Sequence, residues 1–115
     1  MPSASQHYGG FRADLIRQHN GVMLVVLAGE LDVATAPVLQ RRMDALAEEG
    51  QTRIVIDCSD LSYIDSSGVA ILADTWERLT ALGGSLVVRN PSPMAVKLFQ
   101  ITKVASMLLG PDEAA

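Results

Sequence analysis

The sequence predicts a mixed α/β domain, with a sheet of four to five strands opened by a β-hairpin and continued by strands that alternate with three main helices. Three observations predict this class. Short β-branched and aliphatic runs alternate with segments whose apolar residues recur every three or four positions. Asn20-Gly21, which favours a tight turn, separates the first two apolar runs. The length of 115 residues suits one hydrophobic core rather than two.

The first half of the chain predicts a hairpin and a helix. Residues 11–17 alternate between apolar and polar, as in a half-exposed strand, while residues 22–28 are almost wholly apolar. We therefore expect the returning strand to be buried on both faces. Thr35 is a plausible helix cap, and the apolar stripe from Leu39 to Leu46 predicts a helix that ends at Gly50.

The second half continues the alternation. It predicts a buried strand over 53–57, a polar loop, a helix over 69–82 preceded by two serines, and a strand over 85–89. A further helix follows Asn90-Pro91-Ser92-Pro93, and residues 107–109 are read as a short strand. The expected core face of that last helix comprises Ala95, Leu98, Phe99 and Ile101, with Met94 also interpreted as packing.

Composition limits the function classes. We expect a flexible N-terminus over 1–10, a folded domain over 11–110 and a flexible tail over 111–115. A formal net charge of -4 without a basic cluster argues against nucleic acid and anionic membrane surfaces as partners. We see no signal peptide and no apolar segment near the ~20 residues of a membrane span, which fits a cytoplasmic protein. Cys58, the one cysteine, excludes an internal disulfide and is expected to be reduced and structural.

The polar chemistry concentrates in RIVIDCSDLSYIDSSGVAIL, residues 53–72, where a buried strand leads to Asp65-Ser66-Ser67-Gly68. A helix N-terminus leaves backbone N–H groups unpaired, so either a serine or Asp65 caps the helix that follows. The alternative interpretation is a phosphorylation site. A phosphoryl group at a helix N-terminus is favoured by the helix dipole but repelled by the neighbouring carboxylate.

Other chemistry finds less support. Asp57, Asp60 and Asp65 resemble a magnesium or phosphoaspartate set, but a phosphoaspartyl hydrolase needs a second acid where this chain has Ser59. Solvated loop acids are the better interpretation. His7 and His19 are interpreted as exposed bystanders. No nucleophile and base pair, metal-ligand spacing or phosphate-binding glycine loop is found, so we expect no enzyme, metal or cofactor.

Asp32 is interpreted as a turn residue before the first helix. Its loop, residues 30–37, follows one strand, and the loop over 57–68 follows the next. If these strands are parallel neighbours, both loops lie at the same sheet edge, where open α/β sheets place their binding sites. Asp32 would then face the serine loop.

Three motifs in this order resemble the anti-sigma factor antagonists, small single-domain members of the STAS family. They are GELDVATAP at 29–37, VIDCSDLSYIDSSGVAIL at 55–72 and NPSPMAVKLFQIT at 90–102, and the resemblance runs from about Phe11 to Leu109. It implies a STAS-like fold and a bacterial transcription regulator. Unphosphorylated relatives bind an anti-sigma factor that is also a serine kinase, and thereby release the sigma factor.

The resemblance also implies site residues. The kinase would phosphorylate Ser66, rather than Ser67, and a PP2C-type serine phosphatase would restore binding. The partner-binding surface would comprise Asp32, Thr35, Asp65, Ser66, Ser67 and Gly68. We expect a monomer or weak dimer. Two alternatives stay open, a STAS subunit of a transport complex such as a lipid-transport ATPase, and a component of a stress-sensing scaffold. Neither needs a phosphorylation switch.

Overall fold

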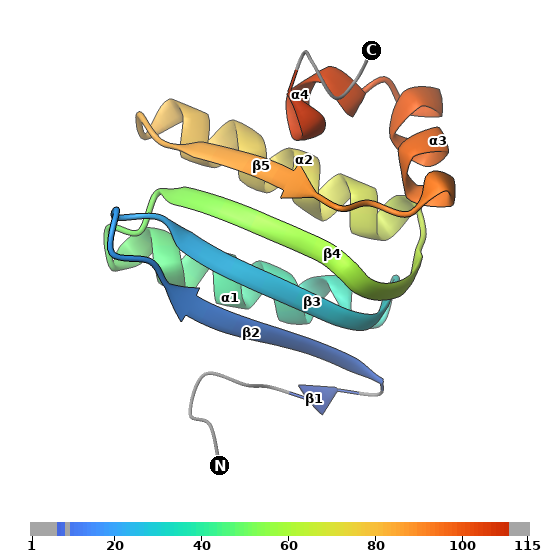
Figure 1. Ribbon diagram of the computed structural model, residues 1–115, viewed down its shortest axis with the longest axis horizontal. Coiled ribbons are helices and arrows are strands. Elements are labelled where there is room, and N and C mark those ends of the chain that lie inside the picture. Colours follow the sequence, from blue (N-terminus) through green and yellow to red (C-terminus); the bar gives the residue numbers. More distant parts are fainter. Residues whose placement is uncertain (1–6, 9, 111–115) are drawn as a thin grey trace.

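The computed structural model describes residues 7–8 and 10–110, and in them the chain forms a five-stranded mixed sheet with helices on one face (Figure 1). The strands are β1 (His7–Tyr8), β2 (Phe11–Arg17), β3 (Met23–Leu31), β4 (Arg53–Ile64) and β5 (Ser85–Arg89). The helices are α1 (Ala36–Glu48), α2 (Ser66–Ala81), α3 (Pro93–Ile101) and α4 (Ala105–Leu109). The predicted fold class is confirmed.

The strands lie in the sheet in their sequence order, β1-β2-β3-β4-β5. β2 and β3 form the predicted antiparallel hairpin, while β3 with β4 and β4 with β5 are parallel. The parallel pairs require crossovers, and α1 and α2 provide them. Both helices pack on the same side of the sheet, whereas α3 and α4 lie at its β5 edge, with α4 against β5 and α2 (Figure 1).

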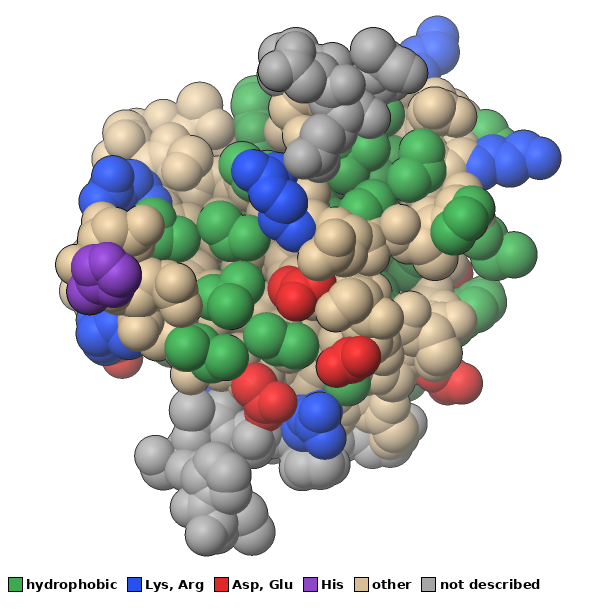
Figure 2. Space-filling model, viewed as in Figure 1, with side chains coloured by type: hydrophobic (Ala, Val, Ile, Leu, Met, Phe, Trp, Pro, Cys, Tyr) green, Lys and Arg blue, Asp and Glu red, His purple; other side chains and the backbone are tan. Residues whose placement is uncertain are grey.

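The core lies between the sheet and α1 and α2. Along β3, Met23, Val25 and Leu27 are buried, whereas Leu24 and Val26 between them are only half-buried. The prediction that residues 22–28 are buried on both faces is therefore wrong, because the face away from the helices has no covering layer among the described residues. Apolar side chains are visible on this open face, among charged ones (Figure 2).

β4 is longer than the sequence predicted. It continues past Asp57 to Ile64, although residues 59, 60, 62 and 63 are exposed. β3 also continues, so the two backbones stay hydrogen-bonded with two register shifts. β5 ends at Arg89 opposite Asp57, so beyond this point β4 is an edge strand whose polar side chains can face water.

Two smaller differences concern the ends of the chain. Residues 105–109 form helix α4 instead of the predicted strand, because Ala105, Leu108 and Leu109 are buried together at helical spacing. Within the predicted flexible N-terminus, residues 7–8 pair with β2, and the remaining predicted flexible residues lie almost wholly outside the described part.

In the described part of the chain no helix has the length and apolarity needed to cross a membrane.

Candidate functional site

The candidate site lies where β3 and β4 end side by side. Leu31 and Ile64 are the last paired residues of the two parallel strands, so Asp32 and Asp65 follow at the same edge of the sheet. The Asp65 amide donates to the Leu31 carbonyl at 3.2 Å, which joins the two loops directly. The sequence predicted this juxtaposition on the condition that the strands are parallel neighbours, and they are.

Asp65 is the cap of helix α2. Its backbone is extended, and its Oδ1 accepts hydrogen bonds from the amides of Ser67 at 2.9 Å and Gly68 at 3.1 Å. The carboxylate also places negative charge at the positive end of the helix dipole. Of the caps that the sequence left open, the structure thus selects Asp65 and leaves both serines in the first turn.

Ser66 is the more accessible serine of the pair. Its side chain is exposed, and no hydrogen bond joins its hydroxyl to another described residue. Ser67 is half-buried and lines a hollow between α1 and α2. Because Asp65 satisfies the helix end, the Ser66 hydroxyl is free for contact with a partner or for modification.

We expect the capping role to be measurable. Replacing Asp65 by alanine should lower the free energy of unfolding by ~1 kcal/mol, because two backbone amides at the start of α2 lose their acceptor. Urea unfolding followed by circular dichroism measures this. The matched control is Ser66→Ala, which should change the stability by less than ~0.5 kcal/mol. A loss of stability in Ser66→Ala without one in Asp65→Ala would show that Ser66, and not Asp65, caps the helix.

The loop before α1 is held by Asp32 and Thr35. The Asp32 carboxylate accepts from the amides of Ala34 at 3.0 Å and Thr35 at 3.1 Å. The Thr35 hydroxyl accepts from the Asp32 amide at 2.9 Å and donates to the Glu30 carbonyl at 2.8 Å. Thr35 occupies the N-cap position, but its side chain makes no cap hydrogen bond, so the predicted cap is wrong in this detail. The buried Thr35 side chain instead holds the loop in place through these two hydrogen bonds.

Gly68 brings the start of α2 close to the end of β3. A Cβ atom at this position would lie 2.9 Å from the Leu31 carbonyl oxygen and 2.8 Å from Cγ1 of Ile64. Real Cβ atoms do not approach so closely, so only glycine fits without a shift of the backbone. The buried Gly68 therefore sets how near the serines lie to the Asp32 loop.

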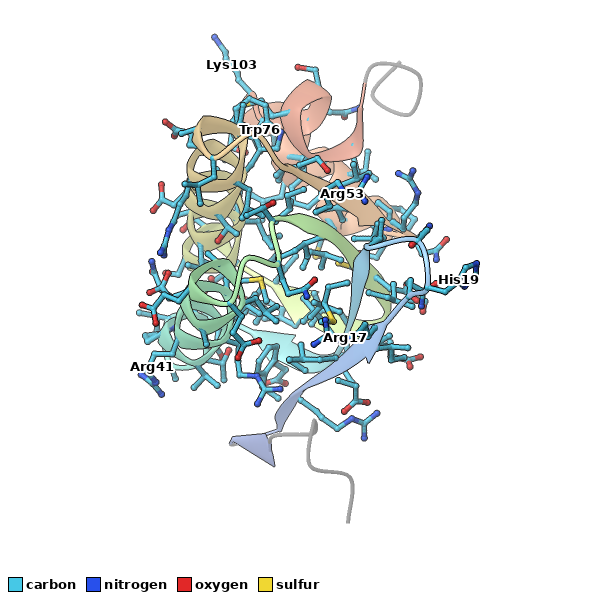
Figure 3. All side chains as sticks on the ribbon, turned by 90° about the vertical axis from the view of Figure 1, so that its left-hand side faces the viewer. Arg17, His19, Arg41, Arg53, Trp76 and Lys103 are labelled. Carbon is cyan, nitrogen blue, oxygen red and sulfur yellow. The ribbon has the colours of Figure 1, made fainter. Side chains whose placement is uncertain are left out.

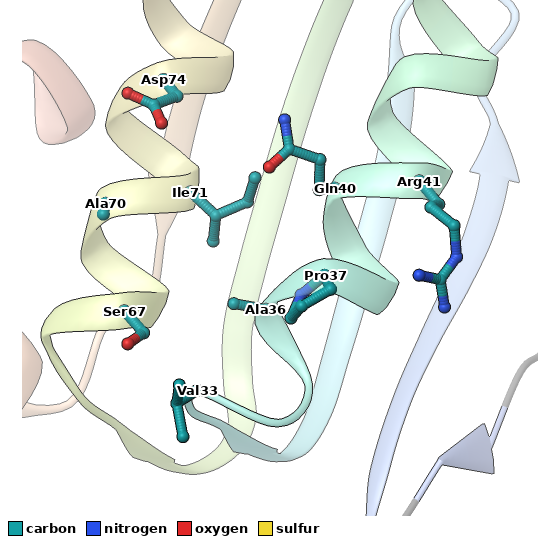
Figure 4. Close-up of a pocket in the computed structure, with 9 residues that line it drawn as sticks. All are labelled: Val33, Ala36, Pro37, Gln40, Arg41, Ser67, Ala70, Ile71 and Asp74. Carbon is teal, nitrogen blue, oxygen red and sulfur yellow. The ribbon is translucent and has the colours of Figure 1, made fainter.

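Two hollows flank the serines. One, of about 420 Å³, lies between α1 and α2, with Val33 and Pro37 on one side and Ser67, Ala70 and Ile71 on the other (Figure 4). The other, of about 400 Å³, lies between the end of β4 and α3, and Ser66 lies on its rim. A partner that contacts the first turn of α2 can reach both.

The remaining candidate acids do not join this site. Burial alone would raise the pKa of Asp57, but hydrogen bonds from the Ser59 amide and the Asn90 side chain hold that pKa below its usual value. Asp57 lies beside Arg89 of β5, whereas Asp65 follows the far end of β4. Among the described residues no group of three His, Cys, Asp or Glu side chains is placed to hold a metal ion.

The other reactive side chains lie elsewhere. Burial, together with the Asp57 charge, raises the pKa of the Cys58 thiol to about 12, so this thiol stays protonated and fits the predicted structural role. His19 is exposed at the hairpin turn and points away from the helices (Figure 3). The side chain of His7 lies outside the described residues.

The fold and the site define a mixed α/β domain with an accessible serine at a capped helix start, beside the ends of two parallel strands. The chain belongs to the STAS domain family, whose pattern matches residues 15–114. It is 36% identical over 93 residues to the anti-sigma-B factor antagonist of Bacillus subtilis, covering 81% of this chain and 84% of that protein. The predicted resemblance is thereby confirmed.

Solved structures agree with this assignment. An anti-sigma factor antagonist from Mycobacterium paratuberculosis superposes with a TM-score of 0.71 at 30% identity, covering 90% of each chain. The phosphorylated form of the Bacillus cell fate determinant SpoIIAA superposes with a TM-score of 0.69 at 26% identity, covering 84% of this chain and 88% of that one. These relatives support an anti-sigma factor antagonist function.

The structure adds residues that the sequence argument missed. Tyr63, Met94, Lys97 and Ile101 line the same hollow as Ser66, and none was a candidate site residue. Met94 and Ile101, both predicted to pack in the core, are exposed instead. A signal was present, since Met94, Leu98 and Ile101 recur at helical spacing beside the second stripe formed by Ala95 and Phe99.

Proposed function

We propose that this protein is an anti-sigma factor antagonist controlled by phosphorylation of Ser66. In its unphosphorylated form it binds an anti-sigma factor that is also a serine kinase, and so frees the sigma factor for transcription. The kinase uses ATP to phosphorylate Ser66, which ends the binding, and a PP2C-type serine phosphatase reverses the modification. Because such a kinase needs ATP, we place the switch in the cytoplasm, with the antagonist a monomer or weak dimer and not itself an enzyme.

The observation that carries the proposal is the division of roles between Asp65 and Ser66. Asp65 caps α2, so the exposed hydroxyl of Ser66 has no structural task among the described residues. A kinase can modify it without disturbing the fold. The likeness to a SpoIIAA structure in the phosphorylated form supports the same chemistry in this family.

Phosphorylation acts here through charge. A phosphoryl group carries nearly two negative charges at pH 7, and the N-terminus of α2 stabilises them by ~0.3–1 kcal/mol. The Asp65 carboxylate opposes this, so the fold is left nearly neutral to the change. Within a closely packed interface the same charges lose their water, and without a partner cation this costs several kcal/mol. We therefore propose that binding, and not folding, responds to the modification.

The surrounding residues divide into contacts and supports. Ser66 is exposed and Ser67, Asp32 and Asp65 are half-exposed, so we propose that these four touch the partner. Thr35 and Gly68 are buried, and we propose that they act by positioning the Asp32 loop and the first turn of α2. Figure 4 shows the residues that line the neighbouring hollow between α1 and α2, which the same partner can cover.

Phosphorylation of single-serine variants tests the proposal. We expect the anti-sigma factor kinase of the source organism to phosphorylate the wild-type chain and Ser67→Ala, but not Ser66→Ala, because the Ser66 hydroxyl is the exposed one. Intact mass spectrometry after incubation with ATP measures the added phosphate. Ser67→Ala is the matched control, since it removes the neighbouring hydroxyl. Phosphorylation of Ser66→Ala, or of none of the three proteins, would contradict the proposed switch.

A further inference from the structure

A groove beside Ser66 separates the end of β4 from helix α3. It encloses about 400 Å³, and its walls include Ile64 and Leu98, with Tyr63 at one side and Met94 and Ile101 along α3. Asp65 and Ser66 form part of the same rim. The groove therefore borders the switch residue directly, on the side of α2 away from the hollow between α1 and α2.

The groove gathers exposed apolar side chains. Six large apolar residues are exposed in the described part of the chain, and three of them line this groove, namely Tyr63 at 48%, Met94 at 69% and Ile101 at 66%. Single exposed apolar residues need no explanation, but several around one hollow are typical of an interaction site. The gathering of three exposed apolar side chains next to Ser66 is therefore the feature that requires an explanation.

Helix α3 presents two apolar stripes. Ala95 and Phe99 are buried against the domain and fix the helix in place. Met94, Leu98 and Ile101, at steps of four and three residues, run along the groove side. A stripe with this spacing on a supported helix is suited to pack against the stripe of a second helix.

Lys97 supplies a charge within this stripe. It is exposed, lines the groove, and forms no ion pair with any described residue. Across the groove lie Ser66 and Asp65. An acidic side chain of a partner would find in Lys97 an available cation beside apolar contacts, and charge complementarity of this kind directs both orientation and partner choice.

We propose that the groove receives an amphipathic helix of the anti-sigma factor. Apolar side chains of that helix pack against Met94, Leu98 and Ile101, and one of its acidic side chains lies opposite Lys97. This inference rests on the proposed function and names the contact through which Ser66 acts. A phosphoryl group on Ser66 places its charge on the rim of the same groove. It repels the partner's acidic side chain and competes with it for Lys97, so the modification acts on the docked helix directly.

Titration calorimetry with the purified anti-sigma factor kinase of the source organism tests the contact. We expect Met94→Ser and Ile101→Ser each to weaken binding about tenfold, as loss of an apolar anchor does in other interfaces. Lys97→Glu should weaken it about tenfold as well, because like charges then meet. The matched controls are Leu82→Ser, exposed at the end of α2, and Lys103→Glu, exposed outside the groove, and both should stay within about twofold of wild type.

The possible results separate the groove from the function. If wild type binds and loses affinity with Ser66→Asp, but all three groove variants bind like the controls, the groove is overturned while the proposed function stands. If wild type binds no anti-sigma factor kinase, both the groove proposal and the proposed function are contradicted. If sedimentation shows a wild-type dimer that Met94→Ser abolishes, while kinase binding is unchanged, the groove serves a second copy of this chain and the inference is wrong. Each variant must retain the wild-type melting temperature, and Lys97→Glu, at an exposed charge, is the variant least able to disturb the fold.

Discussion

The Ser66→Asp variant is expected to bind the anti-sigma factor about 100-fold more weakly than wild type, equivalent to about 2.7 kcal/mol at 25 °C. The charge enters the surface formed by the first turn of α2 and the groove rim, where the partner excludes water. Desolvating a carboxylate there is costly, Asp65 next to it adds repulsion, and in the proposed contact Lys97 is already paired with the partner's acidic side chain. Phosphorylated Ser66 should weaken binding at least as much, because it carries more charge.

Matched variants separate charge from size in this experiment. Ser66→Asn has nearly the shape of Ser66→Asp without the charge, and Ser66→Ala removes only the hydroxyl. We expect both to bind within about tenfold of wild type in the same calorimetric titration, and all three variants to unfold at the wild-type urea concentration. If Ser66→Asn binds as weakly as Ser66→Asp, steric exclusion explains the switch and the electrostatic account is wrong.

Replacing Gly68 by alanine is expected to lower the free energy of unfolding by about 2 kcal/mol, within the range known for overpacked sites. The added methyl group would lie 2.9 Å from the Leu31 carbonyl oxygen, which belongs to the backbone and cannot rotate away. Helix propensity predicts the opposite sign, since alanine within a helix is favoured over glycine by up to ~1 kcal/mol. The direction of the change therefore distinguishes the two effects.

Ala70→Gly, two residues further along on the exposed side of α2, provides the reference for propensity. It should cost ~1 kcal/mol through propensity alone. Urea unfolding of both variants measures the two effects on one helix. If Gly68→Ala is more stable than wild type, α2 does not approach β3 as closely as described, and Gly68 loses its proposed positioning role.

Local signals predicted the parts of the structure that local chemistry determines. Asn20-Gly21 predicted the hairpin turn, and the apolar periodicity from Val69 onward predicted α2. The expected neighbourhood of the Asp32 loop and the serine loop also followed, because alternating strands and helices favour parallel pairing. The family resemblance then added the proposed roles of Ser66 and its neighbours, which no local pattern specifies.

Features that depend on neighbouring elements were not predicted. The extension of β4 to Ile64 depends on β3 lying alongside it, since the residues involved are polar and give no strand signal of their own. The half-buried face of β3 depends on which side the helices cover. Likewise, Met94 and Ile101 are exposed because α3 turns Ala95 and Phe99 toward the core. Helical periodicity alone does not determine which of the two apolar stripes faces inward.

The capping of α2 by Asp65 also makes position 66 a convenient attachment point for a reporter. Since the helix start does not need the serine hydroxyl, a Ser66→Cys variant should fold like wild type and present an exposed thiol at the switch. The one native cysteine, Cys58, is buried with a thiol pKa of about 12, so it competes little for a maleimide dye at neutral pH. Slower labelling of this thiol in the presence of the anti-sigma factor would report that the partner covers position 66.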